Sequence, residues 1–388
     1  MNRMTHRSNL RLILVSLLVG GVMAGCQGLL SPEAALDYGQ AYLDARATLM
    51  QASEDPDPVT RSNAVEALSQ SLGEEAGPVC KQALGDRYPS VRFAAAMAVG
   101  DLRYVPAKPT LLAMAQTGDQ SELAEPDKRV FCAVIYALHR LGDTTYTSEL
   151  GDLLQDSERE VRANAAMVIG KMNEPSAIVP LKMQLADEQD PTVQLQLVEA
   201  LALLGDQRNV DRLEAYTKTQ IMEDQLVAIS AMEHVRSPRT MPVLEGMAAQ
   251  RYPPRIRVTA LGSLAKLGQV DDAGFGFAMD CVREPEKVMH GAYEGRKQVS
   301  ELEVRSLQRL AAITLGLMKK REAASILHPL LNSPDGGVRA ASAMSLMKLL
   351  GAYRPVETPA DEPAVEQDKR EAPEPVTNVE LHTSGGKD

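Results

Sequence analysis

The stretches VRFAAAMAVGDL (Val91 to Leu102) and VRANAAMVIGKM (Val161 to Met172) are two copies of one phrase, and this phrase decides the fold. Weaker copies begin at five further anchor residues: Val130, Val193, Ile256, Val304 and Val338. Self-similarity of this kind is the signature of a solenoid, in which each unit buries its apolar face only against its neighbours. We therefore expect a stack of similar units that together form an extended binding surface.

Each copy has the periodicity of a helix with one buried stripe. Counting from the anchor as zero, mostly apolar residues fall at positions +4, +7, +8 and +11, which in the first copy are Ala95, Ala98, Val99 and Leu102. Several copies end in Gly-Asp. Gly can adopt the left-handed backbone conformation that ends a helix, and Asp can cap the N-terminus of the next helix. A second, less regular helix follows. The sequence therefore predicts an all-α fold, an α-solenoid (superhelix) of antiparallel helix pairs.

The anchor spacing indicates the number of units. Successive anchors are 39, 31, 32, 63, 48 and 34 residues apart, and the longest interval contains a degenerate unit at Asp224 to Met232. With a partial unit at Pro58 to Leu68, about nine units cover residues 55–351. At about 8–10 Å between helices, we expect a superhelix roughly 80 Å long. The phrase-bearing second helices would line its concave face, and such faces usually bind a protein or peptide partner.

The phrase resembles HEAT repeats, most closely the short type found in phycobilisome lyases. An Asp also recurs six residues before an Arg. In HEAT families these positions form a hydrogen-bonded ladder between adjacent units, so the resemblance implies a structural role for the three pairs: Asp55 and Arg61, Asp86 and Arg92, Asp156 and Arg162. Later copies keep the Arg but lose the Asp at this spacing.

One HEAT-type family binds a di-iron centre through repeated His-Glu dipeptides. This chain has no His-Glu dipeptide, which disfavours a di-iron site.

The N-terminus has the pattern of an export signal. Three arginines precede the apolar run from Leu12 to Ala24, which is too short for an ordinary transmembrane helix. The run ends in Val-Met-Ala-Gly-Cys, which resembles the lipobox of bacterial lipoproteins and implies cleavage before Cys26 and acylation of its sulfur. The alternative is an ordinary signal peptide, cleaved near Ala24, with an incidental Cys. In the lipoprotein interpretation, Gln27 implies sorting to the outer membrane, facing the periplasm.

The segments divide the chain into four parts: a signal peptide (1–25), a lipidated N-terminus with a leading helix (26–54), the solenoid (55–351) and an acidic tail (352–388). The tail has five prolines and nine acidic residues, a composition that predicts disorder. Without residues 1–25, the chain has 38 basic and 52 acidic residues, a net charge of −14. This charge disfavours nucleic acid as a partner.

Residues with catalytic or metal-binding potential are scattered. The three cysteines after Cys26 lie in separate units, without a CxxC spacing, and the histidines form no HExxH motif. Cys132 occupies position +2 of its copy, where a packed apolar role is expected. Methionines within the helices are expected to fill space in the hydrophobic core. We therefore predict no catalytic residues, no metal site and no cofactor.

Two loops before phrase-bearing helices are longer than the rest, at residues 118–128 and 283–300. Insertions in repeat proteins often map to a binding face, and the alternative is tolerated loop growth. The second loop supplies a candidate partner-binding set: Lys287, His290, Tyr293, Arg296 and Lys297.

The leading hypothesis is a lipid-anchored, extracytoplasmic HEAT-repeat scaffold that binds a protein or peptide partner in the cell envelope, without catalysis. Two alternatives stay open. One is a HEAT-like lyase-type enzyme or a chaperone for a cofactor-bearing protein. The other is a structural component of the cell envelope.

Overall fold

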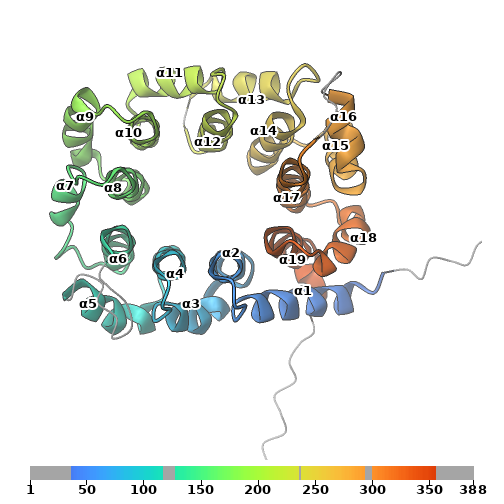
Figure 1. Cartoon of the computed structure of the whole chain (residues 1–388), viewed down its shortest axis with the longest axis horizontal. Coiled ribbons are helices and arrows are strands. Elements are labelled where there is room, and N and C mark those ends of the chain that lie inside the picture. Colours follow the sequence, from blue (N-terminus) through green and yellow to red (C-terminus); the bar gives the residue numbers. More distant parts are fainter. Residues whose placement is uncertain (1–35, 117–126, 236, 293–298, 355–388) are drawn as a thin grey trace, which may run out of the picture.

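A computed structural model of the protein describes residues 36–116, 127–235, 237–292 and 299–354. These residues form helices arranged as two concentric layers (Figure 1). In the described part of the chain, nine helices make up the inner layer: α2 (Pro58–Leu72), α4 (Pro89–Leu102), α6 (Lys128–Arg140), α8 (Arg159–Met172), α10 (Pro191–Leu203), α12 (Met222–Met232), α14 (Pro254–Lys266), α17 (Glu301–Met318) and α19 (Gly336–Leu350).

The outer layer is made of shorter, less regular helices, several of them extended by 3₁₀ turns. The α-helices are α1 (Tyr38–Ala52), α3 (Gly77–Ala83), α5 (Lys108–Gln116), α7 (Glu149–Leu153), α9 (Ile178–Asp187), α11 (Gln207–Tyr216), α13 (Thr240–Ala248), α15 (Asp272–Arg283), α16 (Pro285–Ala292) and α18 (Ala324–Leu327). The 3₁₀ turns are η1 (Gly73–Ala76), η2 (Val105–Ala107), η3 (Pro175–Ala177), η4 (Arg321–Ala323), η5 (His328–Asn332) and η6 (Gly351–Tyr353).

The predicted all-α solenoid is confirmed. Every anchored copy of the phrase forms an inner helix, and so do the partial unit before residue 70 and the degenerate unit near residue 228. The anchors Val91, Val130 and Val161 are almost completely buried, as the periodicity requires. Glycines after inner helices adopt positive φ at Gly142, Gly205 and Gly268. Asp206 then caps α11 by accepting a hydrogen bond from the Asn209 N–H.

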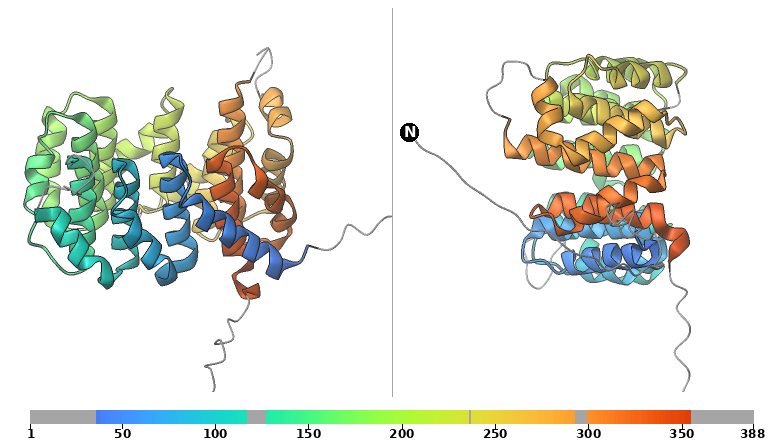
Figure 2. Two further views of the ribbon diagram at one scale, coloured as in Figure 1. Left: turned by 60° about the horizontal axis from the view of Figure 1, so that its bottom comes forward. Right: turned by 90° about the vertical axis from the view of Figure 1, so that its right-hand side faces the viewer.

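The solenoid closes into a ring, which differs from the open superhelix of roughly 80 Å expected at about 8–10 Å between helices. The last helix, α19, packs against both α1 and α2 at the start of the chain (Figures 1 and 2). We call this contact between the first and last described repeat units the seam. One continuous hydrophobic core runs from α14 through α19 and across the seam to α6.

Polar contacts also cross the seam. His328 Nε2 lies 2.9 Å from Asp44 Oδ2, and Lys348 Nζ donates to Gln70 Oε1 at 3.3 Å. The rings of Tyr38 and Tyr353 meet edge to face with centroids 5.0 Å apart. The closest approach is made by glycine: a Cβ on Gly336 would lie only 2.4 Å from Thr60 Oγ1. The seam is therefore packed as tightly as an ordinary repeat interface.

The rest of the ring has two further cores, one spanning α6 to α10 and one spanning α10 to α14. They meet near α10 and α12, where neighbouring inner helices touch less than elsewhere. The ring is thus least tightly packed in the middle of the sequence, opposite the seam in Figure 1.

Candidate functional site: the inner wall of the ring

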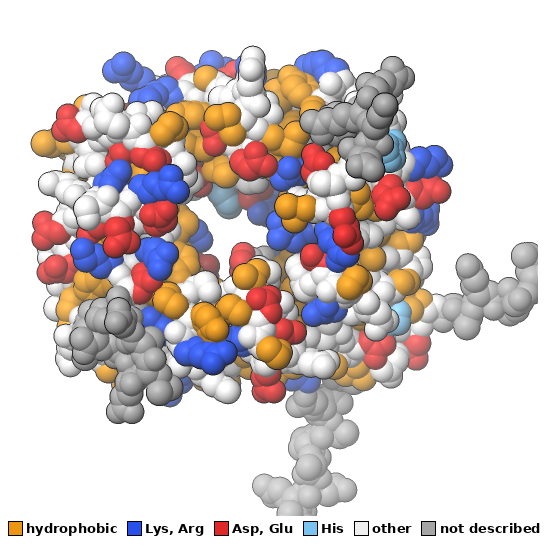
Figure 3. Space-filling model, in the orientation of Figure 1, with side chains coloured by type: hydrophobic (Ala, Val, Ile, Leu, Met, Phe, Trp, Pro, Cys, Tyr) orange, Lys and Arg blue, Asp and Glu red, His pale blue; other side chains and the backbone are white. Residues whose placement is uncertain are grey.

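The inner wall is the face that the nine inner helices turn toward the central opening (Figure 3). Two positions of the repeated phrase, +6 and +10 after the anchor, recur among the residues that line its recesses. At +6 these residues are Met167, Glu199, Gly262, Leu310 and Met344, and at +10 they are Lys171, Leu203, Lys266 and Thr314. The copies of the phrase have mostly apolar residues at positions +4, +7 and +8 but differ at +6 and +10. The side chains that line the recesses therefore differ from unit to unit around the wall.

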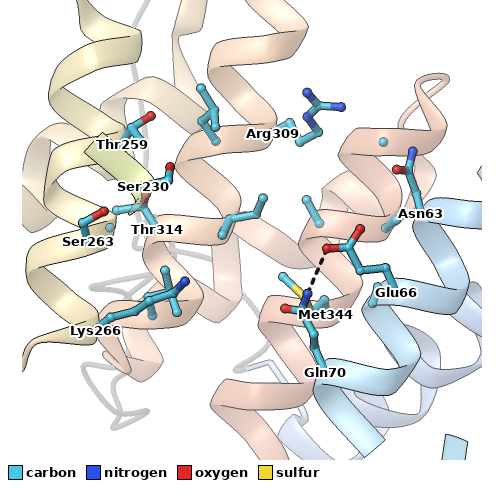
Figure 4. A pocket seen from close by; sticks show the side chains of 18 of the residues that line it. Asn63, Glu66, Gln70, Ser230, Thr259, Ser263, Lys266, Arg309, Thr314 and Met344 are labelled. Atoms are coloured by element: carbon cyan, nitrogen blue, oxygen red, sulfur yellow. Dashed lines mark hydrogen bonds between the residues drawn. The ribbon is translucent and has the colours of Figure 1, made fainter. Parts of the chain in front are cut away.

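The first recess has a volume of about 380 Å³ and is lined by α2, α12, α14, α17 and α19. Figure 4 shows Thr259, Ser263 and Lys266 on one side and Glu66 and Gln70 on the other. Gln70 Nε2 donates to Glu66 Oε1 at 3.0 Å. Because the first and last repeat units both contribute to the lining, this recess exists only in the closed ring.

Glu233 is the most enclosed carboxylate of the first recess, and its side chain is 5% exposed. Burial alone would raise the pKa of Glu233, but hydrogen bonds from His234 and Lys266 hold it below its usual value. His234 Nε2 lies 3.0 Å from the Glu233 carboxylate, and Lys266 pairs with the same oxygen. The Glu233 carboxylate is therefore ionised, and Lys266 balances its charge.

Lys348 lies near the other side of the first recess. Burial lowers the pKa of its ammonium, and the neighbouring charge of Lys266 lowers it further. Its ammonium donates a hydrogen bond to the neutral amide of Gln70. A half-buried lysine near a helix C-terminus is favoured by the helix dipole.

The second recess is larger, about 790 Å³, and lies where the inner helices are least tightly packed. It is lined by the C-terminal halves of α8 and α10 and the turns that follow them, by His234 and Val235 just after α12, and by two residues of the outer helix α11. Its charged or titratable lining residues are Lys171, Glu199 and His234. Burial raises the pKa of Glu199, and this effect exceeds the opposing influence of Gln196, His234 and Lys171.

A third recess, about 360 Å³, opens where α12, α14 and α17 begin. Arg255 reaches Glu223 at 3.4 Å, and Arg305 pairs with Glu301. Arg309 lines both this recess and the first one, so the two adjoin. Its guanidinium has no ion pair within the described ranges.

The structure brings the ladder residues together across units. Arg61 Nε and a terminal nitrogen donate to the Asp86 carboxylate of the next unit at 2.8 and 2.9 Å, and Arg61 reaches Asp55 through the main-chain oxygen. Arg92 is fully buried and donates to the Asp86 and Arg87 oxygens at 3.0 and 3.2 Å.

Farther along, Arg162 donates to the Asp156 main-chain oxygen at 2.8 Å, and its side-chain partner in the next unit is Glu188. The Asp156 carboxylate instead pairs with Lys128 of the preceding unit at 2.5 Å. Arg339 of the last unit lies 3.7 Å from Asp55 of the first, so the same kind of contact crosses the seam. Glu188 and Arg339 complete contacts that the Asp-to-Arg spacing alone does not reveal.

The candidate partner-binding set is only partly described. Lys287 and His290 lie on α16, so residues 285–292 are a helix and not the loop expected. The reason is local: Met289 of this segment is completely buried, which anchors the helix on the core. Lys287 pairs with Glu284 at 2.7 Å. Tyr293, Arg296 and Lys297 lie outside the described residues, as do most of the first long loop, Cys26 and the signal peptide.

The cysteines after residue 26 are buried and unpaired with one another, and burial raises the pKa of the Cys80, Cys132 and Cys281 thiols to about 12. Across the described ranges, no three His, Cys, Asp or Glu side chains cluster as metal ligands would. None of the helices found there has the length and apolar character needed to span a bilayer.

Comparison with known proteins agrees with this geometry. The sequence pattern of HEAT repeats matches residues 45–125 and 120–202. The two matches together span residues 45–202, from α1 to α10. No significant match was found among curated protein sequences.

Solved structures with similar folds are distant. The complex of CpcE and CpcF of phycocyanin lyase from Nostoc sp. PCC7120 aligns with 70% of this chain and 100% of its own, at 17% identity and a TM-score of 0.40. Human deoxyhypusine hydroxylase covers 73% of this chain and 98% of its own, at 17% identity and a TM-score of 0.34. Kap121p covers 77% of this chain and 37% of its own, at 11% identity and a TM-score of 0.31. Likenesses at this level carry no functional argument.

Proposed function

We propose that this HEAT-repeat protein is a lipid-anchored, extracytoplasmic scaffold that binds a segment of a partner protein against its inner wall, without catalysis. The observation that supports the proposal most is the composition of the inner wall. Its recesses carry charged groups without an ion pair in the described structure, Glu199 and Arg309, and Lys348 lies beside the first recess, hydrogen-bonded to Gln70. Concave faces of repeat proteins typically bind partners in this way.

The location of the protein belongs to the same proposal. The lipobox-like sequence before Cys26 favours acylation, and several acyl chains would bind the membrane firmly, at about 0.8 kcal/mol per buried methylene. The signal implies the cell envelope, with the outer membrane facing the periplasm as the preferred site. The lyase-type and structural alternatives stay open as predictions.

Partner capture by the inner wall can be tested with a photoreactive amino acid in living cells. p-Benzoylphenylalanine at Gln70, which lines the first recess, is expected to crosslink to a distinct partner band. The same residue at Glu245, which is exposed on the outer helix α13, is the matched control and should give no such band. Crosslinking only from the outer position would contradict the proposal, and mass spectrometry of the band would identify the partner.

The lipid anchor has a test of its own. Cells labelled with radioactive palmitate are expected to incorporate label into the wild-type chain and not into a Cys26→Ser variant. The variant should also leave the membrane fraction, because the acyl chains supply the attachment. Equal labelling of both chains would rule out Cys26 as the acylated residue.

A further inference from the structure

The second recess contains one carboxylate, Glu199, that makes no direct ion pair with the described residues. Lys171 has a carboxylate partner, Asp101 at 3.9 Å, and His234 has Glu233 at 3.0 Å. Glu199 has no ion pair among the described residues, and its hydrogen bond comes from the neutral Gln196 amide at 3.2 Å. Of the three titratable side chains lining this recess, Glu199 alone has no opposite charge within 4.0 Å in the described structure.

A half-buried carboxylate with no ion-pair partner within 4.0 Å is costly, even though His234 and Lys171 act on it from farther away. Removing a charge from water is favourable only when a partner charge or several hydrogen bonds replace the lost hydration. Desolvation is the largest influence on Glu199 and raises its pKa. The fold nevertheless keeps a glutamate at a position where other copies of the phrase have Met97 or Met167, which are apolar. Such a group is suited to a cation that arrives from outside.

The shape of the recess agrees with a cation on an aliphatic stem. Met167, Leu203 and Val210 form apolar wall around Glu199, and Asn173 and Gln207 add neutral polar groups. An ammonium or guanidinium could meet the carboxylate while its methylenes lie on the apolar wall, as lysine and arginine side chains do on protein surfaces. The volume of about 790 Å³ leaves room for such a group together with neighbouring atoms of its carrier.

We infer that the second recess is a binding subsite for an organic cation, an ammonium or guanidinium group, with Glu199 as its counter-ion. This inference rests on the proposed function in one respect: the expected carrier is a lysine or arginine of the segment bound against the inner wall. A free diamine offers the same chemistry, and the two sources are separated by experiment.

The test is an NMR titration of the purified full-length chain with ¹³C-methyl methionine, in which Met167 reports on the recess. The probes are acetyl-Ala-Ala-Lys-Ala-Ala-amide, the same peptide with norleucine in place of lysine, and cadaverine. The lysine peptide is expected to shift the Met167 signal saturably, and the norleucine peptide is not. Glu199→Gln should weaken binding about tenfold or more, because a charge-assisted hydrogen bond is lost. Glu245→Gln, on the outer layer, is the matched control and should bind as the wild type does.

Folding of the variant is monitored separately. Glu199→Gln should melt at the wild-type temperature or above it, since an enclosed, unpaired charge is removed. Saturation by cadaverine without response to the peptide would assign the site to a free amine. Equal binding of lysine and norleucine peptides, undiminished binding by Glu199→Gln, or no response to any probe would overturn the inference. None of these results depends on the cellular partner, whose capture is tested by the crosslinking above.

Discussion

Cysteines at residues 60 and 336 are expected to form a disulfide that seals the ring. An ideal Cβ on Gly336 lies 3.3 Å from the Thr60 Cβ, close to the Cβ separation of about 3.5–4.5 Å seen in disulfides. The bond would enclose nearly the whole solenoid in one covalent loop. Loop-closure entropy then predicts stabilisation of about 5–6 kcal/mol for so long a loop. In an open superhelix these residues would lie at opposite ends, and no intramolecular bond would form.

The measurement is migration on a non-reducing gel, followed by thermal melting with and without reductant, in a Cys26→Ser background. The remaining cysteines should not compete, because they are buried and their thiol pKa values are raised to about 12. Thr60→Cys with Gly291→Cys is the matched control, since Gly291 lies on the outer helix α16. A double variant at residues 60 and 336 that stays reduced under oxidising conditions would show that the ring is open.

Arg162→Met is expected to lower the free energy of unfolding by about 3–5 kcal/mol, the usual result of removing one partner of a buried ion pair. Arg162 Nε and a terminal nitrogen donate to the Glu188 carboxylate at 2.8 and 3.0 Å. The Glu188 side chain is only 3% exposed, so the substitution leaves an enclosed charge. Chemical denaturation followed by circular dichroism measures the loss.

Arg159→Met is the matched control, three residues earlier in the same helix. Its side chain is 63% exposed and pairs with the exposed Glu160, so the expected loss is below about 1 kcal/mol. Adding Glu188→Gln to Arg162→Met should recover part of the stability, because the uncompensated charge disappears. Equal losses for the two arginine variants would contradict a structural role for the ladder contact.

The stabilisation that the Arg162–Glu188 pair contributes depends on pH. The hydrogen bond from Arg162 lowers the pKa of Glu188 from 4.5 to about 2. Because the folded-state pKa is below the unfolded one, the stabilisation is present above pH 4.5 and is lost as the pH falls toward 2. The stability difference between wild type and Arg162→Met should therefore shrink over this range.

The inner wall illustrates how far sequence reasoning reaches. The spacing of Val91 and its counterparts predicted the helices, their buried stripes and their inner position. The repeat pattern predicts methionines such as Met167 to be core filler and does not single out Glu199, and only the structure places both on the lining of the second recess. The recesses themselves could not be predicted, because each combines helices from several units. The first recess joins Glu66 and Lys266, which lie far apart in the chain and meet only across the closed ring.

One sequence signal of closure was available. An open solenoid needs a polar outer face on its terminal units. The last helix has only two charged residues, Arg339 and Lys348, among fifteen, and most of its residues are buried. A helix that is apolar nearly all round must be covered on several sides. Here α1 and α2 supply that cover.

The sequence by itself determined the repeating helix pair, because a 3.6-residue period and a buried stripe are local properties of each copy. Only the tertiary structure decided that nine such pairs close into a ring. The angle between neighbouring units depends on side-chain volumes on both sides of each interface, as where Gly100 meets Tyr136 and Gly170 meets Ala200. Small rotations of this kind add up around the solenoid, and their sum brings Gly336 to Thr60.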